Sequence, residues 1–242
     1  MKIAIISDVH GNLEAFQSVI ASFSNLGVEK VMFLGDIVGY GANPNECIEL
    51  LKSICDDNIA GNHDYAAVGK TDITYFNLHA RQAILWTADV LSQANKRFLA
   101  SLPLIATLPN GIMVHSAPQH PELWDYIISL SAARIHFRNF TQQLCFVGHS
   151  HRPGIFILDR SGALSFEDLA SITVKEDFRY IINVGSVGQP RDGNPLSSYG
   201  LYDTTTKQYR LIRVAYNIAM AQQKILAAGL PRFLAERIAV GY

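Results

Sequence analysis

Residues 3–10 read Ile-Ala-Ile-Ile-Ser-Asp-Val-His, a short apolar run that ends in an aspartate and a histidine two positions apart. The run Ile3–Ile6 is brief and rich in β-branched residues, which is typical of a buried strand. Residues 12–26 follow with apolar side chains at steps of three and four, which predicts a helix. A strand that leads through a polar turn into a helix is the repeating unit of an α/β domain.

The same ending, an apolar run followed by polar residues, occurs four more times. The runs cover residues 31–34, 58–60, 112–114 and 144–147. They are followed by Gly35-Asp36, Gly61-Asn62-His63-Asp64, His115 and Gly148-His149-Ser150-His151. In α/β sheets, binding sites gather outside the carboxyl ends of the strands. We therefore expect these polar side chains to converge.

The side chains at the strand ends form a set of candidate metal ligands. They are Asp8, His10, Asp36, Asn62, His115, His149 and His151. Oxygen and nitrogen donors without thiolate suit manganese, iron, zinc, cobalt or nickel and do not choose among them. Manganese is the metal we favour. These are more ligands than one ion usually needs, whereas two ions that share Asp36 would use them all. Two such ions roughly 3.5–4 Å apart can activate a water molecule and clamp a phosphoryl group.

Spacing within the blocks supports convergence. Asp8 and His10 are two apart, as are His149 and His151. Residues two apart on an extended segment point to the same side, so each pair is expected to reach one metal or two adjacent metals. Each block alone has a structural reading, for example as a turn or a helix cap. Their joint occurrence, with five of the eight histidines inside the blocks, favours the metal site.

The rest of the chain predicts further elements around this core. A helix is expected over residues 45–54 and a long helical region over 73–100. Residues 155–214 are expected to be β-rich, with a hairpin that turns at 160–162 and strands at Tyr180–Val184, Leu201-Tyr202 and Gln208–Val214. Two short helices are expected after Asn217, broken at Gly229-Leu230-Pro231. We predict one domain over residues 1–214 and a helical appendage over 215–242, which covers an apolar face of the domain or forms a dimer contact.

Composition narrows the classes of partner. The formal net charge of the 242 residues is −1 and no basic run occurs, so no signature of a nucleic-acid or membrane surface is present. The three cysteines lack C-x-x-C spacing and are expected to be reduced thiols. No stretch approaches the roughly 18 unbroken apolar residues of a membrane span. A cytoplasmic location is the resulting expectation.

Taken together, the five blocks resemble the calcineurin-like metallophosphoesterase superfamily in order and loose spacing. Within it they look closest to small prokaryotic phosphodiesterases, including a branch often labelled diadenosine tetraphosphatase-like. The resemblance implies an αββα fold, in which two β-sheets pack face to face with helices outside. It also implies that Asp8, His10, Asp36 and His151 hold one metal. The residues implied for the other metal are Asp36, Asn62, His115 and His149.

The resemblance assigns His63 and Asp64 to catalysis. His63, beside the ligand Asn62, would contact the phosphate, either stabilising it or protonating the leaving oxygen. Asp64 would orient the His63 ring, and a neighbouring carboxylate favours the charged imidazole that such a donor needs. Serine/threonine protein phosphatases of the superfamily carry an arginine soon after the Gly-Asp block, and that arginine is absent here. Arg191, in a glycine-rich loop, is a candidate substitute, with an ion pair to Asp192 as the alternative.

The activity implied is hydrolysis of a phosphodiester or phosphomonoester by a hydroxide bound to two metals, with a small phosphorylated substrate, a nucleotide being one option. A dinucleoside polyphosphate hydrolase is the first alternative. A non-catalytic interaction scaffold, like a retromer coat subunit of the same fold, is the second. The aromatic pair Trp124 and Tyr126 after His115 could stack on a base, although packing is favoured. A homo-oligomer stays open.

Overall fold

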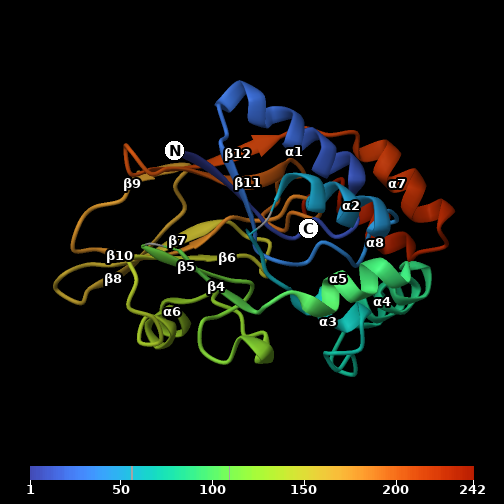
Figure 1. Cartoon of the computed structure of the whole chain (residues 1–242), viewed down its shortest axis with the longest axis horizontal. Coiled ribbons are helices and arrows are strands. Elements are labelled where there is room, and N and C mark those ends of the chain that lie inside the picture. The colour runs from blue at the N-terminus through green and yellow to red at the C-terminus, as the bar shows by residue number, and fades with distance from the viewer. Residues whose placement is uncertain (56, 109) are drawn as a thin grey trace.

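In a computed structural model of the chain, two six-stranded β-sheets pack face to face and helices cover their outer faces (Figure 1). The structure describes residues 1–55, 57–108 and 110–242. In spatial order, the first sheet contains β3 (Asp57–Asn58), β2 (Lys30–Phe33), β1 (Lys2–Ile6), β11 (Ser197–Asp203), β12 (Gln208–Val214) and β9 (Ser171–Thr173). The second contains β4 (Ile105–Leu108), β5 (Gly111–Val114), β6 (Leu144–Val147), β10 (Arg179–Asn183), β7 (Gly154–Leu158) and β8 (Leu164–Glu167). This arrangement confirms the predicted two-sheet α/β sandwich.

Alternate residues of the central strands enter different cores. In β1, Ile3 and Ile5 pack between the two sheets, whereas Ala4 and Ile6 pack toward the helices of the first sheet. In β6 the pattern repeats, with Phe146 between the sheets and the neighbouring odd-numbered positions on the side of α6. Burial on both faces explains why these strands read as continuous apolar runs.

The helices lie in two outer layers. α1 (Leu13–Leu26) and α7 (Ile218–Ala227) lie outside the first sheet, and α6 (Leu130–His136) lies outside the second (Figure 1). The others are α2 (Pro44–Ile54), α3 (Asn62–Ala67), α4 (Leu78–Val90), α5 (Gln93–Ser101), α8 (Arg232–Arg237) and a 3₁₀ turn at Pro121–Leu123. Among the described residues, none of these helices is long and apolar enough to span a membrane.

Most predicted elements are confirmed, with shifts of one or two residues at their ends. The hairpin at 155–166 is present, with Leu158 opposite Leu164. The region 73–100 is not one helix: residues 73–77 are irregular, and α5 starts anew where the Ser92 hydroxyl accepts the N–H of Asn95 at 3.2 Å. β4, β9 and α6 have no counterpart among the predicted elements, because they are short and partly exposed.

Parallel pairing aligns the strand ends that matter. β1, β2 and β3 run parallel in the first sheet, and β5, β6 and β10 run parallel in the second. The loops after the two groups touch: a ring nitrogen of His115 lies 2.8 Å from the carbonyl oxygen of Leu34, and the His149 N–H donates to Asp8 at 3.1 Å. The loops at the carboxyl ends of the parallel strands of both sheets therefore lie next to one another.

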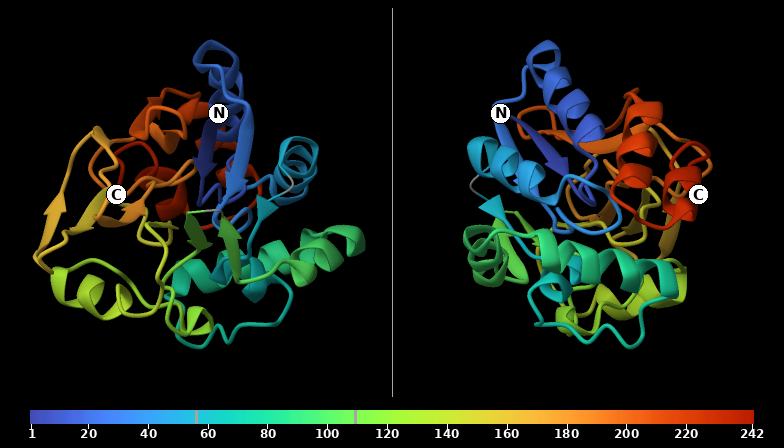
Figure 2. Two further views of the ribbon diagram at one scale, coloured as in Figure 1. Left: turned by 60° about the vertical axis from the view of Figure 1, so that its left-hand side comes forward. Right: turned by 90° about the vertical axis from the view of Figure 1, so that its right-hand side faces the viewer.

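The C-terminal helices pack on the rest of the chain. α7 and α8 bury apolar residues against α4 and Tyr40, and an ion pair between Lys224 and Glu14 ties α7 to α1. In Figure 2, right panel, these red helices lie on the same side of the molecule as α1. The division of the chain near residue 214 stays a prediction.

Candidate metal centre

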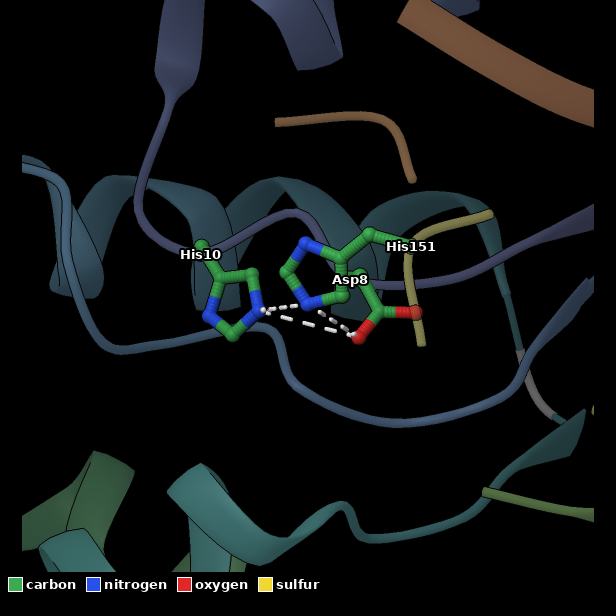
Figure 3. A group of neighbouring side chains, drawn as sticks. All are labelled: Asp8, His10 and His151. Carbon is green, nitrogen blue, oxygen red and sulfur yellow. Dashed lines mark hydrogen bonds and ion pairs between the residues drawn. The ribbon is translucent and has the colours of Figure 1, made fainter. Parts of the chain in front are cut away.

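All seven predicted ligands are buried at the carboxyl ends of the parallel strands. Their Asp and His side chains, together with His63, form close groups whose ligand atoms lie within 4.8 Å of one another. The groups are Asp8, His10 and His151; Asp36, His115 and His149; and His10, Asp36 and His63. Figure 3 shows the first group, in which two loops point their rings at one carboxylate. Asp36 belongs to two groups, as a bridging ligand would. Asn62 lines a hollow together with His149 and His63.

The candidate ligands converge, but the backbone that carries them has a different conformation from the predicted extended one. Five of the candidate ligands have left-handed φ angles between 51° and 63°, so neither pair lies on an extended segment: Asp8, His10, Asp36, His149 and His151. This conformation costs a non-glycine residue on the order of 1–3 kcal/mol. Neighbouring loops hold it in place. The Asp8 N–H donates to the Gly35 carbonyl at 3.0 Å, and the Asp8 carbonyl accepts the Ser186 hydroxyl at 2.8 Å.

Each of the four candidate ligand imidazoles has one ring nitrogen within hydrogen-bond distance of a backbone carbonyl oxygen. The contacts are His10 Nδ1 to Val38 (3.0 Å), His115 Nδ1 to Leu34 (2.8 Å), His149 Nε2 to Trp124 (2.9 Å) and His151 Nδ1 to Gln189 (2.6 Å). A carbonyl oxygen can only accept, so these nitrogens carry the protons of the neutral rings. The other nitrogen of each ring then presents a lone pair, which is the usual arrangement around a metal-binding histidine.

These lone pairs face other acceptors. Nε2 of His10 lies 3.1 Å from Nε2 of His151, which in turn lies 3.1 Å from Oδ1 of Asp8. Asp8 Oδ1, Asn62 Oδ1 and His115 Nε2 are buried without a hydrogen-bond partner. Buried polar atoms are rarely left without a partner in native proteins. A divalent cation would lie between the lone pairs that face each other and would bind the oxygen and nitrogen atoms that have no hydrogen-bond partner. The residues present therefore suit the metal centre implied by the resemblance.

Electrostatics keeps Asp8, Asp36, His149 and His151 in the forms that bind a metal. Burial lowers the pKa values of His149 and His151 to about 3, so both rings are neutral near pH 7. Burial opposes the ionisation of Asp8 and Asp36, but nearby histidines outweigh it and lower both pKa values. Burial also opposes a charge on His115, yet Asp36 and Asp8 raise its pKa to about 9. The carboxylates therefore favour a positive charge at that nitrogen.

Asp64 does not contact the His63 ring, in contrast to the role expected from the sequence. Both oxygens of Asp64 accept backbone N–H groups, from Asp36 (2.7 Å), Ile37 (2.9 Å), Val38 (3.2 Å) and Gly61 (3.0 Å). Nδ1 of His63 is buried without a partner, so Asp64 does not orient that ring. Burial lowers the pKa of His63 well below its usual value, and Asp36 opposes this only in part. These surroundings favour a neutral imidazole, and the charged form stays a prediction.

Asp64 instead fixes the loop that carries Asp36. Replacing Asp64 with Asn would turn an amide nitrogen toward two backbone N–H groups. Leaving buried donors unsatisfied costs roughly 1–3 kcal/mol each. We expect a loss of about 2–4 kcal/mol, which lowers Tm by about 5–15 °C for a chain of this size. Thermal unfolding followed by circular dichroism measures it.

The matched control is Asp89→Asn, because Asp89 is exposed on α4. Surface substitutions of this kind change stability by roughly 0.5 kcal/mol or less. An equal drop in Tm for both variants would contradict the anchoring role of Asp64.

Arg191 lies beside the centre and not against Asp192. Asp192 pairs with Arg213. The Arg191 side chain donates to Oε1 of Gln189 at 2.8 Å, and its guanidinium lies 5.6 Å from the ring centre of Tyr40. The alternative of an Arg191–Asp192 ion pair is therefore wrong, and Arg191 stays a candidate for substrate binding.

The expected packing of the aromatic pair after His115 holds for Trp124 and not for Tyr126. Trp124 is partly buried, with its ring centre 6.1 Å from those of Tyr65 and His115. Tyr126 stacks on the His149 ring at 4.1 Å between centres, yet remains 50% exposed. The carbonyl of Trp124 fixes the His149 tautomer. Tyr40, which the sequence did not single out, places its ring 4.6 Å from His10 and 4.5 Å from His63. Its position directly after the Gly35–Gly39 block is the only sequence signal that could have found it.

Comparisons with known proteins agree with this geometry. A family model described as a calcineurin-like phosphoesterase superfamily domain matches residues 1–207. The uncharacterized protein MJ0912 of Methanocaldococcus jannaschii is 43% identical over 243 residues, which cover 99% of this chain and 98% of that protein.

Two solved structures share the fold over the whole chain. The crystal structure of a metallophosphoesterase from Sphaerobacter thermophilus is 40% identical with a TM-score of 0.88, covering 100% of this chain and 99% of that one. The hypothetical protein PH1004 from Pyrococcus horikoshii OT3 is 18% identical with a TM-score of 0.81, covering 100% and 98%. The second likeness concerns the fold alone.

Proposed function

Since the chain belongs to the calcineurin-like phosphoesterase superfamily, we propose that it is a hydrolase of phosphodiester or phosphomonoester bonds that uses two divalent metal ions. The observation that carries the proposal is the set of opposed acceptors in the buried centre. The lone pairs of His10 and His151 face each other and Asp8 without a proton to share. Such an arrangement is repulsive unless a cation lies within it.

The proposed ligands divide between two ions. Asp8, His10 and His151 would hold one ion, His115, His149 and Asn62 would hold the other, and Asp36 would bridge them. When bound, such ions supply a nucleophile from water at neutral pH and neutralise charge on the phosphoryl oxygens; manganese is the metal we favour. The four backbone carbonyls behind the imidazoles keep each ring turned toward its ion.

His63 would act on the substrate and not as a ligand. Its ring lines a hollow of about 320 Å³ together with Asn62, His149 and Tyr126. The ring is held by Tyr40 and by Phe76, whose ring centre lies 5.0 Å away. A phosphate in this hollow would lie beside His63 and raise its pKa, because an anion favours the charged imidazole. His63 could then stabilise the phosphate or donate a proton to the leaving oxygen.

Two alternatives rank below this proposal. A dinucleoside polyphosphate hydrolase is supported by the exposed ring of Tyr126 at the mouth of the hollow, where a base could stack. A non-catalytic scaffold is disfavoured, because His63 is retained beside the centre. We also propose a cytoplasmic location, since the three cysteines are free and buried.

Metal content and turnover test the proposal together. The purified chain is analysed for metals and assayed with an aryl phosphodiester and an aryl phosphomonoester, with and without added manganese. We expect about two metal ions per chain and turnover that depends on manganese. The preferred ester identifies the substrate type. A chain that binds no metal and hydrolyses neither ester after metal addition would overturn the proposal in favour of the scaffold.

A further inference from the structure

A second hollow of about 340 Å³ adjoins the metal centre and is lined by three arginines. Its lining residues are Tyr126, Ile128, Ser150, Arg152, Arg191, Arg237 and Tyr242. Ser150 lies in the chain between the candidate ligands His149 and His151. Tyr126 lines both this hollow and the one that contains His63. The two hollows therefore share the Tyr126 side chain.

Among the described residues, none of the three arginines forms an ion pair with an acidic side chain. Arg152 donates to the carbonyl oxygen of Arg191 at 3.0 Å, Arg191 donates to Gln189, and Arg237 donates to a main-chain oxygen of Tyr242, the last residue of the sequence. In the described part of the chain, the arginines that form ion pairs with carboxylates are Arg213 and Arg232. Burial lowers the pKa of Arg237 to about 10, and the nearby Arg191 charge adds to this effect. Guanidinium groups that line a hollow without an acidic side-chain partner leave a site for an anion.

Resting on the proposed phosphoesterase function, we infer that Arg152, Arg191 and Arg237 bind a second phosphate of the substrate. The substrate would then be a nucleoside polyphosphate, so this inference favours the dinucleoside polyphosphate alternative over a simple ester. One phosphate would be attacked while the next one along the chain is held by the arginines. Guanidinium groups bind phosphate oxygens through paired hydrogen bonds. The exposed rings of Tyr126 and Tyr242 border the same hollow and suit a base.

The reaction remains a simple hydrolysis. Water adds its oxygen to the attacked phosphorus, and the P–O bond to the neighbouring phosphate breaks. The departing phosphate oxygen keeps the bonding electron pair, and the protons of the water go to that oxygen or to solvent. The arginines stabilise the negative charge that this neighbouring phosphate carries.

This inference gives the C-terminal helices a part in substrate selection. Arg237 ends α8 and Tyr242 follows it, so both belong to the proposed appendage over residues 215–242. The loop after β10 supplies Arg191, and the loop after β6 supplies Arg152. Because the site is formed by three separate segments, no single segment of the sequence contains a motif that identifies it.

The test compares two substrates on the manganese-loaded enzyme. One is diadenosine tetraphosphate, which offers further phosphates, and the other is bis(p-nitrophenyl) phosphate, which has one. We expect the ratio of the two kcat/KM values to fall about ten- to a hundred-fold in Arg237→Gln and in Arg152→Gln, since each removes a charge-assisted contact. Arg152 is exposed, so this variant is expected to fold even if Arg237→Gln does not.

Arg232→Gln is the matched control, because Arg232 lies on the same helix with its side chain 82% exposed and away from the hollow. It is expected to keep the wild-type ratio. Hydrolysis of the aryl ester with an unchanged ratio in both hollow variants would overturn the inference while leaving the phosphoesterase proposal intact. So would an equal fall in Arg232→Gln.

A binding measurement separates the inference from catalysis. ATP is titrated calorimetrically into the metal-free chain in excess chelator, where no turnover is expected. A Kd that weakens about ten- to a hundred-fold in Arg152→Gln or Arg237→Gln, and not in Arg232→Gln, supports the second phosphate site even if neither ester is hydrolysed. No ATP binding by the wild-type chain would overturn it.

Discussion

Replacing Asp36 with Asn is expected to lower kcat/KM by roughly 10³-fold or more and to reduce the bound metal below two ions per chain. Oδ2 of Asp36 lies 3.3 Å from Nε2 of His115 and 3.7 Å from Nε2 of His10, so it serves both halves of the centre. Metal ions contribute several kcal/mol to stabilising charge in the transition state. About 4 kcal/mol corresponds to roughly a thousand-fold in rate. Elemental analysis and steady-state kinetics on an aryl phosphodiester measure both effects.

The Asp36→Asn variant is expected to fold. Oδ1 of Asp36 accepts the N–H of His63 at 2.8 Å, and the amide oxygen of Asn can keep that bond. Burial raises the pKa of Asp64, and the charge of Asp36 raises it further, so removing that charge relieves repulsion between two buried carboxyl groups. Asp89→Asn serves as the control for activity. An Asp36→Asn chain that retains two ions and a tenth of the wild-type rate would exclude Asp36 as the bridge.

The sequence predicts the fold and the convergence of the ligands for one physical reason. Strands buried on both faces read as short apolar runs, and parallel strands bring their carboxyl ends together. The polar residue after each run therefore lies at the same edge, as His115 and His149 do across from Asp8. The order of the blocks supplies the rest, because their joint pattern is specific to one superfamily.

Backbone conformation at the centre could not be read in the same way. Asp8 and His10 adopt left-handed φ angles, which a glycine would signal and an aspartate or histidine does not. The anchoring role of Asp64 has no signal in the sequence, and the family resemblance implied a contact with the His63 ring in its place. In the structure, α3 begins at this point and turns Asp64 toward the N–H groups of the loop after β2.

The hollow lined by Arg152, Arg191 and Arg237 could not be predicted from the sequence. The apolar pattern of a helix predicts which face is buried, but it does not say what lies opposite the other face. The sequence around Arg237 therefore does not indicate that this residue lines the same hollow as Arg152, which is 85 positions earlier in the chain (237 − 152). The exposure of Tyr126 was equally unreadable, because it lies in an irregular segment without periodicity.

Replacing His63 with Ala is expected to lower kcat by about 10²–10⁴-fold while both metal ions remain bound, if its ring donates the proton to the leaving oxygen. The ring lines the hollow beside the centre, and its Nδ1 faces Gly39, where an added Cβ would lie 2.5 Å away. His79→Ala is the control, since His79 lies on α4 and stacks on Phe233 outside the metal cluster. Unchanged turnover in His63→Ala would remove His63 from the mechanism.

The leaving group separates the two roles open to His63. A proton donor matters most when the departing oxygen is basic, so the loss in His63→Ala should be large for a phenyl or alkyl ester and small for a p-nitrophenyl ester. A group that only stabilises the phosphate charge acts on all esters alike, so the loss should then be equal across the series. Metal analysis of the same samples distinguishes both cases from a lost ion. A loss that depends on leaving-group basicity, with two ions retained, would identify His63 as the general acid.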